Sequence, residues 1–214
     1  MNRKIAAVGD SHSLRCFENH ALIADSKVYF GYNKLDGKTA YKLKDHDKKV
    51  RKIITPIKDK HIIFVFGEVD VRIHIKYQHR QSGIPVKTLV ENTAKRYTGY
   101  IAQLRNEGFD IHVFNVVPTG DFAGKQFESW EKKLKYPFDN NFKERQLYTL
   151  MLNSELNLCC QMRGIPFIDI YQYLVDARGA RKKELVYDFA HINSKTADIV
   201  MEHYCFSNVL ENVI

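Results

Sequence analysis

The sequence lacks a long apolar run, since no stretch approaches the roughly 18 consecutive apolar residues that a membrane-spanning helix needs. Cysteine is also scarce: the chain has four among 214 residues, and their irregular spacing fits neither a disulfide framework nor paired zinc ligands. No internal repeat or low-complexity tract is present. The sequence therefore predicts no membrane span and no disulfide scaffold, and we expect its thiols to be reduced and mostly buried.

A recognisable secretion signal is missing as well. The first eight residues lead directly into Gly9-Asp10-Ser11-His12. This leaves no room for the charged, apolar and cleavage regions of a signal peptide. We therefore expect the protein to be cytoplasmic.

Positive charge is in excess, with 33 lysine and arginine residues against 25 aspartate and glutamate residues, a formal net charge of +8. Such a balance favours an anionic partner, for example an acidic glycan or a phosphorylated small molecule. The densest basic stretch, residues 42–60, is typical of a solvated helical face, and no nucleic-acid-binding signature accompanies it. We expect no nucleic-acid and no membrane partner, and the oligomeric state stays open.

Short apolar runs alternate with longer helical patterns, which indicates βαβ units around a parallel sheet. The length favours one domain spanning residues 1–214. We predict an α/β fold with a doubly wound sheet of about five parallel strands and helices on both faces. The expected strands are Ile5–Val8, Lys27–Phe30, His61–Phe66, Ile111–Asn115 and Pro166–Ile168. The expected helices are Ser13–Ala24, Asp45–Thr55, Val86–Glu107, Asn141–Arg163 and Ser194–Leu210.

Residues with special backbone roles mark some boundaries. Ser194 is expected to cap the last helix, and Gly108 and Gly164 stand where helix C-terminal glycines belong. The region Val117–Asn140 contains two prolines, two glycines and several aromatic residues, and it is too long for a routine connection. It is a candidate lid or substrate loop.

Polar segments follow two expected strands and precede the last helix. Ligands of open α/β sheets bind at the carboxyl ends of the strands, so these segments are the first to inspect. Ser11 falls at a strand-to-helix turn, where a helix N-terminus favours negative charge. A serine hydroxyl needs a base, and an imidazole oriented by a carboxylate is the usual one. Asp188 and His191, just before the expected last helix, supply that pair of groups, so we expect Ser11, His191 and Asp188 to be catalytic.

These blocks resemble the SGNH, or GDSL-like, hydrolases, whose first block is Gly-Asp-Ser and whose last is Asp-x-x-His near the C-terminus. Order and spacing fit along almost the whole chain. The resemblance implies a flavodoxin-like three-layer α/β/α fold, with Ser11 as nucleophile, His191 as base and Asp188 as its partner. It also implies an oxyanion hole made from the Ser11 N–H, a second-block glycine and a third-block asparagine.

The oxyanion hole departs from the family pattern. Gly37 is the favoured second-block glycine, with Gly31 as the alternative. The third block, Gly67-Glu68-Val69-Asp70, carries Val69 where the family has its asparagine, so one donor is missing. Such a loss costs about 2.7–4 kcal/mol of transition-state stabilisation. Arg72 is the candidate substitute because its charge is permanent and it has five donors, although Glu68 and Arg72 could equally form a loop ion pair.

Further polar residues are expected to line the substrate or to support the catalytic groups: Asp10, His12, Glu68, Asp70 and His74. Asp10 is interpreted as fixing the turn through backbone N–H groups rather than as a proton carrier. No metal and no cofactor are predicted. A two-metal phosphoesterase site built from Asp10, His12 and the later Asp and His residues is an alternative, but the Asn-His-Glu/Asp and Gly-His-x-His segments of that class are missing.

Together these residues predict an ester hydrolase that passes through an acyl-serine. The segment Phe66–Arg72 also resembles a GDSL-like subgroup linked to surface polysaccharides, which implies an acylated carbohydrate or similar small ester as substrate. An O-acyltransferase with the same triad is an alternative, because both reactions share the acyl-serine. A catalytically weak binding module of the same fold is another alternative.

Overall fold

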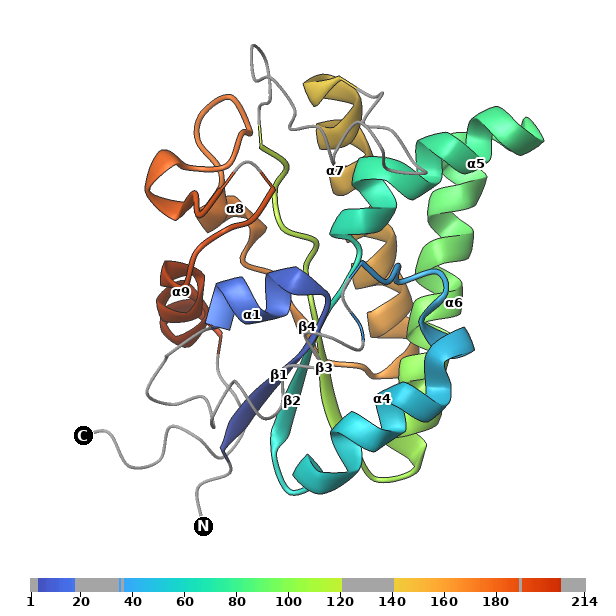
Figure 1. The fold of residues 1–214 in the computed structure, drawn as a ribbon, viewed down its shortest axis with the longest axis vertical. Coiled ribbons are helices and arrows are strands. Elements are labelled where there is room, and N and C mark those ends of the chain that lie inside the picture. The colour runs from blue at the N-terminus through green and yellow to red at the C-terminus, as the bar shows by residue number, and fades with distance from the viewer. Residues whose placement is uncertain (1–3, 18–34, 36, 121–140, 189, 205–214) are drawn as a thin grey trace.

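The computed structural model describes residues 4–17, 35, 37–120, 141–188 and 190–204 (Figure 1). At its centre, four parallel strands form one sheet in the order β1-β2-β3-β4. They are β1 (Ile5–Gly9), β2 (His61–Val65), β3 (Asp110–Phe114) and β4 (Phe167–Ile168). Every residue of β1 and β2 is buried, as expected for apolar strands covered on both faces.

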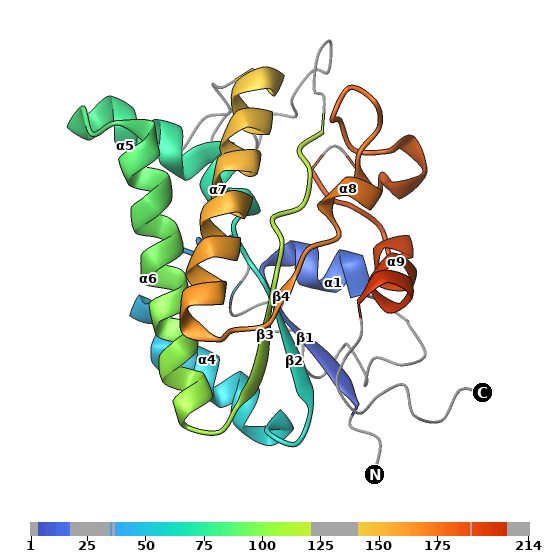
Figure 2. The ribbon, with the colours of Figure 1, turned by 180° about the vertical axis from the view of Figure 1, so that it is seen from behind.

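Helices cover both faces of the sheet, which gives three layers (Figures 1 and 2). One face carries α1 (Ser11–Phe17), α8 (Tyr171–Leu174) and α9 (Lys195–His203). The other carries α4 (Asp47–Ile54), α5 (Ile75–Ser82), α6 (Val86–Asn106) and α7 (Phe142–Arg163). Short 3₁₀ turns occur at Leu43–His46, Thr55–Ile57 and Lys183–Leu185, and a π-helical turn at Asp70–His74 leads into α5. The predicted three-layer α/β fold is confirmed.

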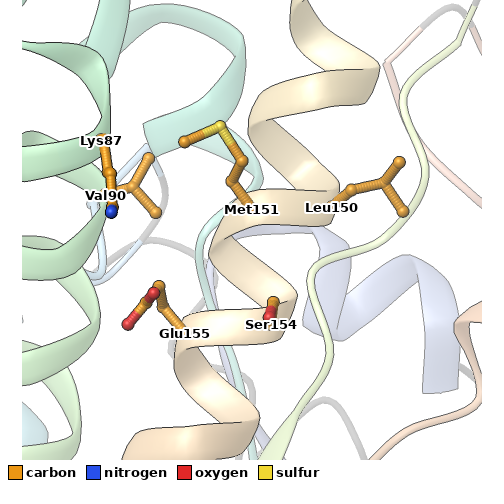
Figure 3. A pocket seen from close by; sticks show the side chains of 6 residues that line it. All are labelled: Lys87, Val90, Leu150, Met151, Ser154 and Glu155. Atoms are coloured by element: carbon orange, nitrogen blue, oxygen red, sulfur yellow. The ribbon is translucent and has the colours of Figure 1, made fainter.

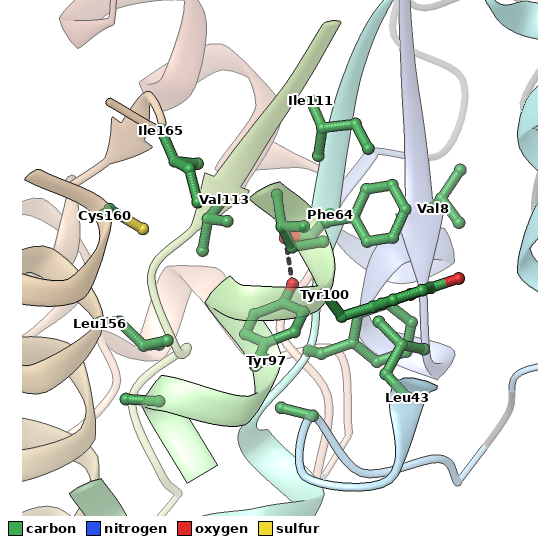
Figure 4. Close-up of a cluster of buried hydrophobic side chains, with 14 of the residues drawn as sticks. Val8, Leu43, Phe64, Tyr97, Tyr100, Ile111, Val113, Leu156, Cys160 and Ile165 are labelled. Carbon is green, nitrogen blue, oxygen red and sulfur yellow. Dashed lines mark hydrogen bonds between the residues drawn. The ribbon is translucent and has the colours of Figure 1, made fainter. Parts of the chain in front are cut away.

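Each face of the sheet has its own apolar cluster. The cluster under α6 and α7 includes Phe64 of β2 and Tyr97 of α6 (Figure 4). Tyr97 is almost fully buried, and its hydroxyl lies 3.4 Å from the Phe64 carbonyl oxygen, the acceptor marked in Figure 4. This contact satisfies a polar group that would otherwise be costly inside an apolar core.

The strand register places all the carboxyl ends at one edge of the sheet. Ile5 pairs with His61 and Gly9 with Val65, while His61 pairs with Asp110. The three longer strands therefore begin level and end level. The segments that follow them emerge side by side, which is where open parallel sheets hold their ligands.

Most predicted elements are found where the sequence places them. The helices α6 and α7 begin and end within one residue of their predicted bounds. Asn141 and Glu144 form a capping box at the N-terminus of α7, in which the side chain of each accepts the backbone N–H of the other. Gly164 ends α7 in the left-handed conformation, with φ of 60°. The predicted strand Lys27–Phe30, the ends of two predicted helices and most of the predicted lid lie outside the described residues.

Some expectations were wrong in detail. The helix α1 begins at Ser11, two residues earlier than predicted, so the serine lies within its first turn. Ser194 does stand at the N-cap of α9, but its side chain makes no capping hydrogen bond. The sequence analysis also missed α5 and the π-helical turn before it, because this segment is polar and has little helical apolar periodicity. Among the described residues, no helix has both the length and the apolar character needed to cross a membrane.

Candidate active site

The turn between β1 and α1 fixes the position of Ser11. A Cβ atom on Gly9 would clash with the Val65 carbonyl oxygen of the neighbouring strand, so only glycine fits there. The Asp10 carboxylate accepts the His12 backbone N–H at 2.9 Å, and the Ser13 hydroxyl donates to the Asp10 carbonyl oxygen at 2.8 Å. These local bonds tighten the turn and place Ser11 at the N-terminus of α1.

A continuous hydrogen-bonded chain joins Ser11, His191 and Asp188. The Ser11 Oγ atom lies 2.8 Å from His191 Nε2, although the two residues are 180 positions apart in sequence. On the other side of the ring, Nδ1 lies 2.7 Å and 2.9 Å from the two Asp188 carboxylate oxygens. Since a carboxylate only accepts, Nδ1 carries a proton, and Nε2 of the neutral ring accepts from the serine hydroxyl. The same carboxylate accepts the backbone N–H groups of Ala190 and His191, which shapes the loop.

The electrostatic surroundings favour a neutral imidazole and an ionised carboxylate. Burial and the neighbouring His12 lower the pKa of His191, and Asp188 only partly opposes them. Burial works to raise the pKa of Asp188, but its hydrogen bonds to the backbone and ring of His191 outweigh burial and lower it. A neutral imidazole at neutral pH can accept a proton, which is what a general base requires.

His12 lies next to the ring of His191 and is almost completely buried. Its Nδ1 is 3.2 Å from an Asp10 carboxylate oxygen, and its Nε2 is 3.1 Å from the Ala190 carbonyl oxygen. Both partners only accept, so the ring donates from both nitrogens and is an imidazolium. Burial opposes that charge, but Glu68 and Asp10 raise the pKa of His12 above its ordinary value. The charged ring links the nucleophile turn to the loop that carries His191.

Glu68 and Arg72 form an ion pair at the end of β2, with 2.9 Å between the Arg72 Nε and the Glu68 carboxylate. Gly67, with φ of 115°, makes the turn before them, and a Cβ there would press against Val116. Glu68 is buried, and Arg72 is 14% exposed. The structure thus contains the loop ion pair that was the alternative to an oxyanion role for Arg72. A role for Arg72 at an oxyanion stays a prediction.

Asp70 holds a neighbouring loop. It is fully buried, and its carboxylate accepts the backbone N–H groups of Ala40 at 2.6 Å and Tyr41 at 3.2 Å. Burial raises the pKa of Asp70 to about 7, against the effect of these two donors. His74 lies 3.7 Å from the same carboxylate, and burial lowers the pKa of its ring to about 4. Of the described hydrogen bonds and ion pairs, none joins Asp70 or His74 to Ser11, and their role in substrate binding stays a prediction.

Gly37 begins the same loop in an exposed left-handed turn, with φ of 64°. This conformation suits glycine, and open space surrounds the place where a Cβ would lie. Its role as an oxyanion donor stays a prediction. The alternative, Gly31, lies outside the described residues.

The sequence analysis missed Arg181, which organises the loop around the base. Arg181 is 5% exposed. It donates to four backbone carbonyl oxygens: Ala190 and His191 at 2.7 Å, Pro118 at 3.2 Å and Asp188 at 3.4 Å. Burial lowers its pKa. No sequence signal could have found it, because it stands in a run of similar basic residues.

A separate open groove of about 390 Å³ lies between α6 and α7 (Figure 3). It is lined by Lys87, Val90, Leu150, Met151, Ser154 and Glu155. None of the residues that the sequence analysis singled out lines it. The catalytic candidates belong instead to the strand ends at the carboxyl edge of the sheet.

Solved structures with a similar fold include several ester-hydrolysing enzymes. A protein assigned as an acylhydrolase from Bacteroides fragilis aligns with a TM-score of 0.59 and 14% identity, covering 94% of this chain and 83% of that one. A GDSL-like lipase from Bacteroides thetaiotaomicron aligns with a TM-score of 0.56 and 14% identity, covering 94% of this chain and 84% of that one. An acetyl xylan esterase aligns with a TM-score of 0.54 and 13% identity, covering 94% of this chain and 100% of that one. No protein-family model and no curated protein sequence matches the chain.

These similarities define the class of fold. The chain has the fold of the SGNH, or GDSL-like, hydrolases, as its first and last sequence blocks predicted. At such low identity the similarity establishes the architecture alone. The chemistry has to be argued from the side chains of this chain.

Proposed function

We propose that this protein is a serine ester hydrolase in which Ser11 is the nucleophile, His191 the general base and Asp188 its orienting acid. The observation that carries the proposal is the unbroken hydrogen-bonded chain from the Ser11 hydroxyl through both ring nitrogens of His191 to the Asp188 carboxylate. The solved structures of similar fold support it, since their names describe lipases, acylhydrolases and an esterase.

In the proposed reaction the Ser11 oxygen attacks the ester carbonyl while His191 Nε2 takes the hydroxyl proton. Asp188 stabilises the imidazolium that forms. The alcohol leaves with that proton, and the acyl group stays on Ser11. Water then attacks the acyl-serine with His191 again as base, which releases the acid and restores the serine. No cofactor is needed for any of these steps.

Each attack converts the carbonyl group into a tetrahedral intermediate. The negative charge on the oxygen of that intermediate has to be stabilised. The Ser11 N–H stands at the N-terminus of α1, where a developing anion is favoured. We assign the second contribution to Arg72, which Glu68 holds at the end of β2 and whose charge also acts on His12. The Gly37 N–H is the third candidate donor.

The proposed substrate is a small acyl ester on a carbohydrate, with negative charge on the carrier. The net charge of +8 favours anionic molecules. The Arg15 guanidinium lies over the ring of Tyr187, 4.3 Å from its centre, and Tyr187, which directly precedes Asp188, is half exposed. A guanidinium close to the Asp188 loop suits a carboxylate on the carrier.

Covalent labelling tests the proposal. A fluorophosphonate should label the wild-type protein and leave Ser11→Ala unlabelled, and p-nitrophenyl acetate hydrolysis should fall by at least about 10³-fold in Ser11→Ala and His191→Ala. In Asp188→Asn it should fall by about 10⁴-fold, because the imidazole then takes the wrong tautomer. Ser82→Ala and His79→Gln, both in the C-terminal half of α5, are the matched controls. A wild type that is not labelled and that hydrolyses no faster than Ser11→Ala and His191→Ala would identify a binding module.

The substrate is tested separately with purified acetylated oligosaccharides. Acetate release should be faster from acetylated galacturonate oligomers, which are anionic, than from acetylated xylose oligomers, which are neutral. Added salt should reduce the difference by screening the charge. Equal rates at low salt would refute the preference for negative charge while leaving the serine mechanism intact.

A further inference from the structure

Three metal-ligating side chains meet at the edge of the sheet opposite the Ser11 site. His61 begins β2, Asp110 begins β3, and His112 lies two residues further along β3. The register pairs His61 with Asp110 and Ile63 with His112. Because residues two apart in a strand point to the same face, all three side chains face the layer that contains α1 and α9.

The ligand atoms of these residues converge. His61 Nδ1 is 2.7 Å from Asp110 Oδ2, and His112 Nε2 is 3.3 Å from Asp110 Oδ1. One ligand atom from each residue lies within 4.8 Å of the other two, and among the described residues this is the one group of three with such an arrangement. Both histidines are buried, while Asp110 is 25% exposed and gives access from solvent.

We propose that His61, Asp110 and His112 bind a divalent transition-metal ion, and that Zn²⁺ suits the site best. Imidazole nitrogens and a carboxylate oxygen are common zinc ligands, at about 2.0–2.2 Å. Two such ligands on a tetrahedral ion lie about 3.4 Å apart, a value that follows from those bond lengths. The 2.7 Å and 3.3 Å pairs use different oxygens of Asp110, and one ligand atom from each of the three residues lies within 4.8 Å of the other two, so side-chain rotation is needed to bring them to this spacing. Water can complete the tetrahedron.

Tyr204 orients one of the ligands. His112 Nδ1 lies 2.9 Å from the Tyr204 hydroxyl, and the two rings meet edge to face, with centres 5.8 Å apart. When Nδ1–H donates to this hydroxyl, the lone pair of Nε2 points toward Asp110, as a metal ligand requires. Metal-ligating histidines regularly use their second ring nitrogen in this way.

Asp110 contributes the carboxylate of the ligand set and lies against both histidines. The Arg105 Nη1 atom lies 3.5 Å from Asp110 and contributes positive charge in the absence of an ion. A bound cation would share the Asp110 carboxylate with this guanidinium. His61 would then keep its ring proton on Nε2 and turn the lone pair of Nδ1 to the metal.

The site is separate from the proposed catalysis, because five-residue strands lie between His61 and the Ser11 edge. A bound ion would fasten the first residues of β2 and β3 together and, through Tyr204, tie them to the segment after α9. The expected consequence is stabilisation of the fold. Neither the cysteine pattern nor the spacing of these three residues in the sequence indicates a metal site. From the sequence we therefore expected no metal.

Equilibrium dialysis against Zn²⁺ followed by elemental analysis tests the proposal. The wild type should retain one zinc per chain, whereas His61→Gln and His112→Gln should retain less than about a fifth of that. His79→Gln, which changes a partly exposed histidine on α5, should bind like the wild type. Ser11→Ala and His191→Gln should also bind normally, which separates this site from the catalytic one. A wild type without zinc, or equal zinc in all variants, overturns the proposal.

Two measurements on the wild type guard against variants that fail to fold. Co²⁺ should give the visible absorption bands of a tetrahedral nitrogen and oxygen site. In histidine-selective NMR spectra, zinc should shift two ring signals, one from each ligand. Zinc at 100 times its dissociation constant should also raise the free energy of unfolding by about 2.7 kcal/mol. Shifts confined to other histidines would locate the ion elsewhere and refute the assignment.

Discussion

The rings of His12 and His191 lie 4.9 Å apart, centre to centre, at a tilt of 43°. His12 is the charged member of this pair, because Asp10 and the Ala190 carbonyl both accept from its ring. His191 is the neutral member, because burial and the charge on His12 lower its pKa. Two histidines in contact thus have opposite protonation states, and this division suits one for positioning and the other for proton transfer.

The pH dependence of activity should reveal the effect of the His12 charge on the pKa of His191. The base must be neutral, so activity rises with pH as His191 loses its proton, and its lowered pKa puts this rise below pH 6.5. In His12→Gln the neighbouring positive charge is removed, so the pKa of His191 increases and the rise moves to higher pH. The ring separation of 4.9 Å puts His191 close enough to sense the loss of that charge.

Initial rates of p-nitrophenyl acetate hydrolysis from pH 4.5 to 8.5 measure that shift. His74→Gln is the control, since His74 is a partly buried histidine that supports a different loop. Equal midpoints for wild type and His12→Gln would mean that His12 carries no charge that His191 senses. A lower kcat with an unchanged midpoint would leave His12 with a purely structural role.

Val69 occupies the place of the asparagine in the family's third block, so installing that amide should add an oxyanion donor. We expect Val69→Asn to raise kcat by at least about tenfold, since one such donor is typically associated with a factor of 10²–10³. Val69→Leu, which keeps the position apolar, is the control. Slower turnover in Val69→Asn than in Val69→Leu would show that this position does not face the reacting carbonyl.

Arg72 is expected to carry part of the same stabilisation. Arg72→Ala should lower kcat by about 10²-fold with little change in KM, because the charge acts on the transition state. Glu68→Gln separates the roles, since it breaks the ion pair but keeps the arginine. If both variants lose the same activity and the same thermal stability, the pair is structural and Arg72 is no oxyanion donor.

Arg181 should couple stability to activity. Its buried guanidinium donates to the carbonyl oxygens of four residues around the base, and hydrogen bonds from a charged group contribute about 1.5–3 kcal/mol each. We expect Arg181→Ala to lower the free energy of unfolding in urea by about 2–4 kcal/mol and to reduce kcat. Arg181→Lys should recover only part of both, because an ammonium group cannot reproduce the planar set of donors.

A surface arginine supplies the comparison for that experiment. Arg178 is 70% exposed and pairs with Asp176, so Arg178→Ala should change the free energy of unfolding by less than about 1 kcal/mol. A similarly small change in Arg181→Ala would contradict the role assigned to the buried guanidinium.

Local patterns in the sequence determined most of the architecture. Apolar runs gave the positions of β1, β2 and β3, and helical periodicity with end-capping residues gave α6 and α7 almost to the residue. The candidate triad was also visible, because Gly-Asp-Ser and Asp-x-x-His are short motifs whose residues act within a turn of each other. Such signals depend only on neighbours along the chain.

Tertiary structure alone decided how those motifs meet and what surrounds them. The contact between His12 and Ala190 spans 178 positions, and Arg181 reaches back 63 positions to Pro118. His61 and Asp110 face each other because parallel strands pair in one register. The charge of a buried histidine depends on which acceptors the fold brings to its two nitrogens. No pattern local to the sequence encodes that, because the acceptors come from distant segments.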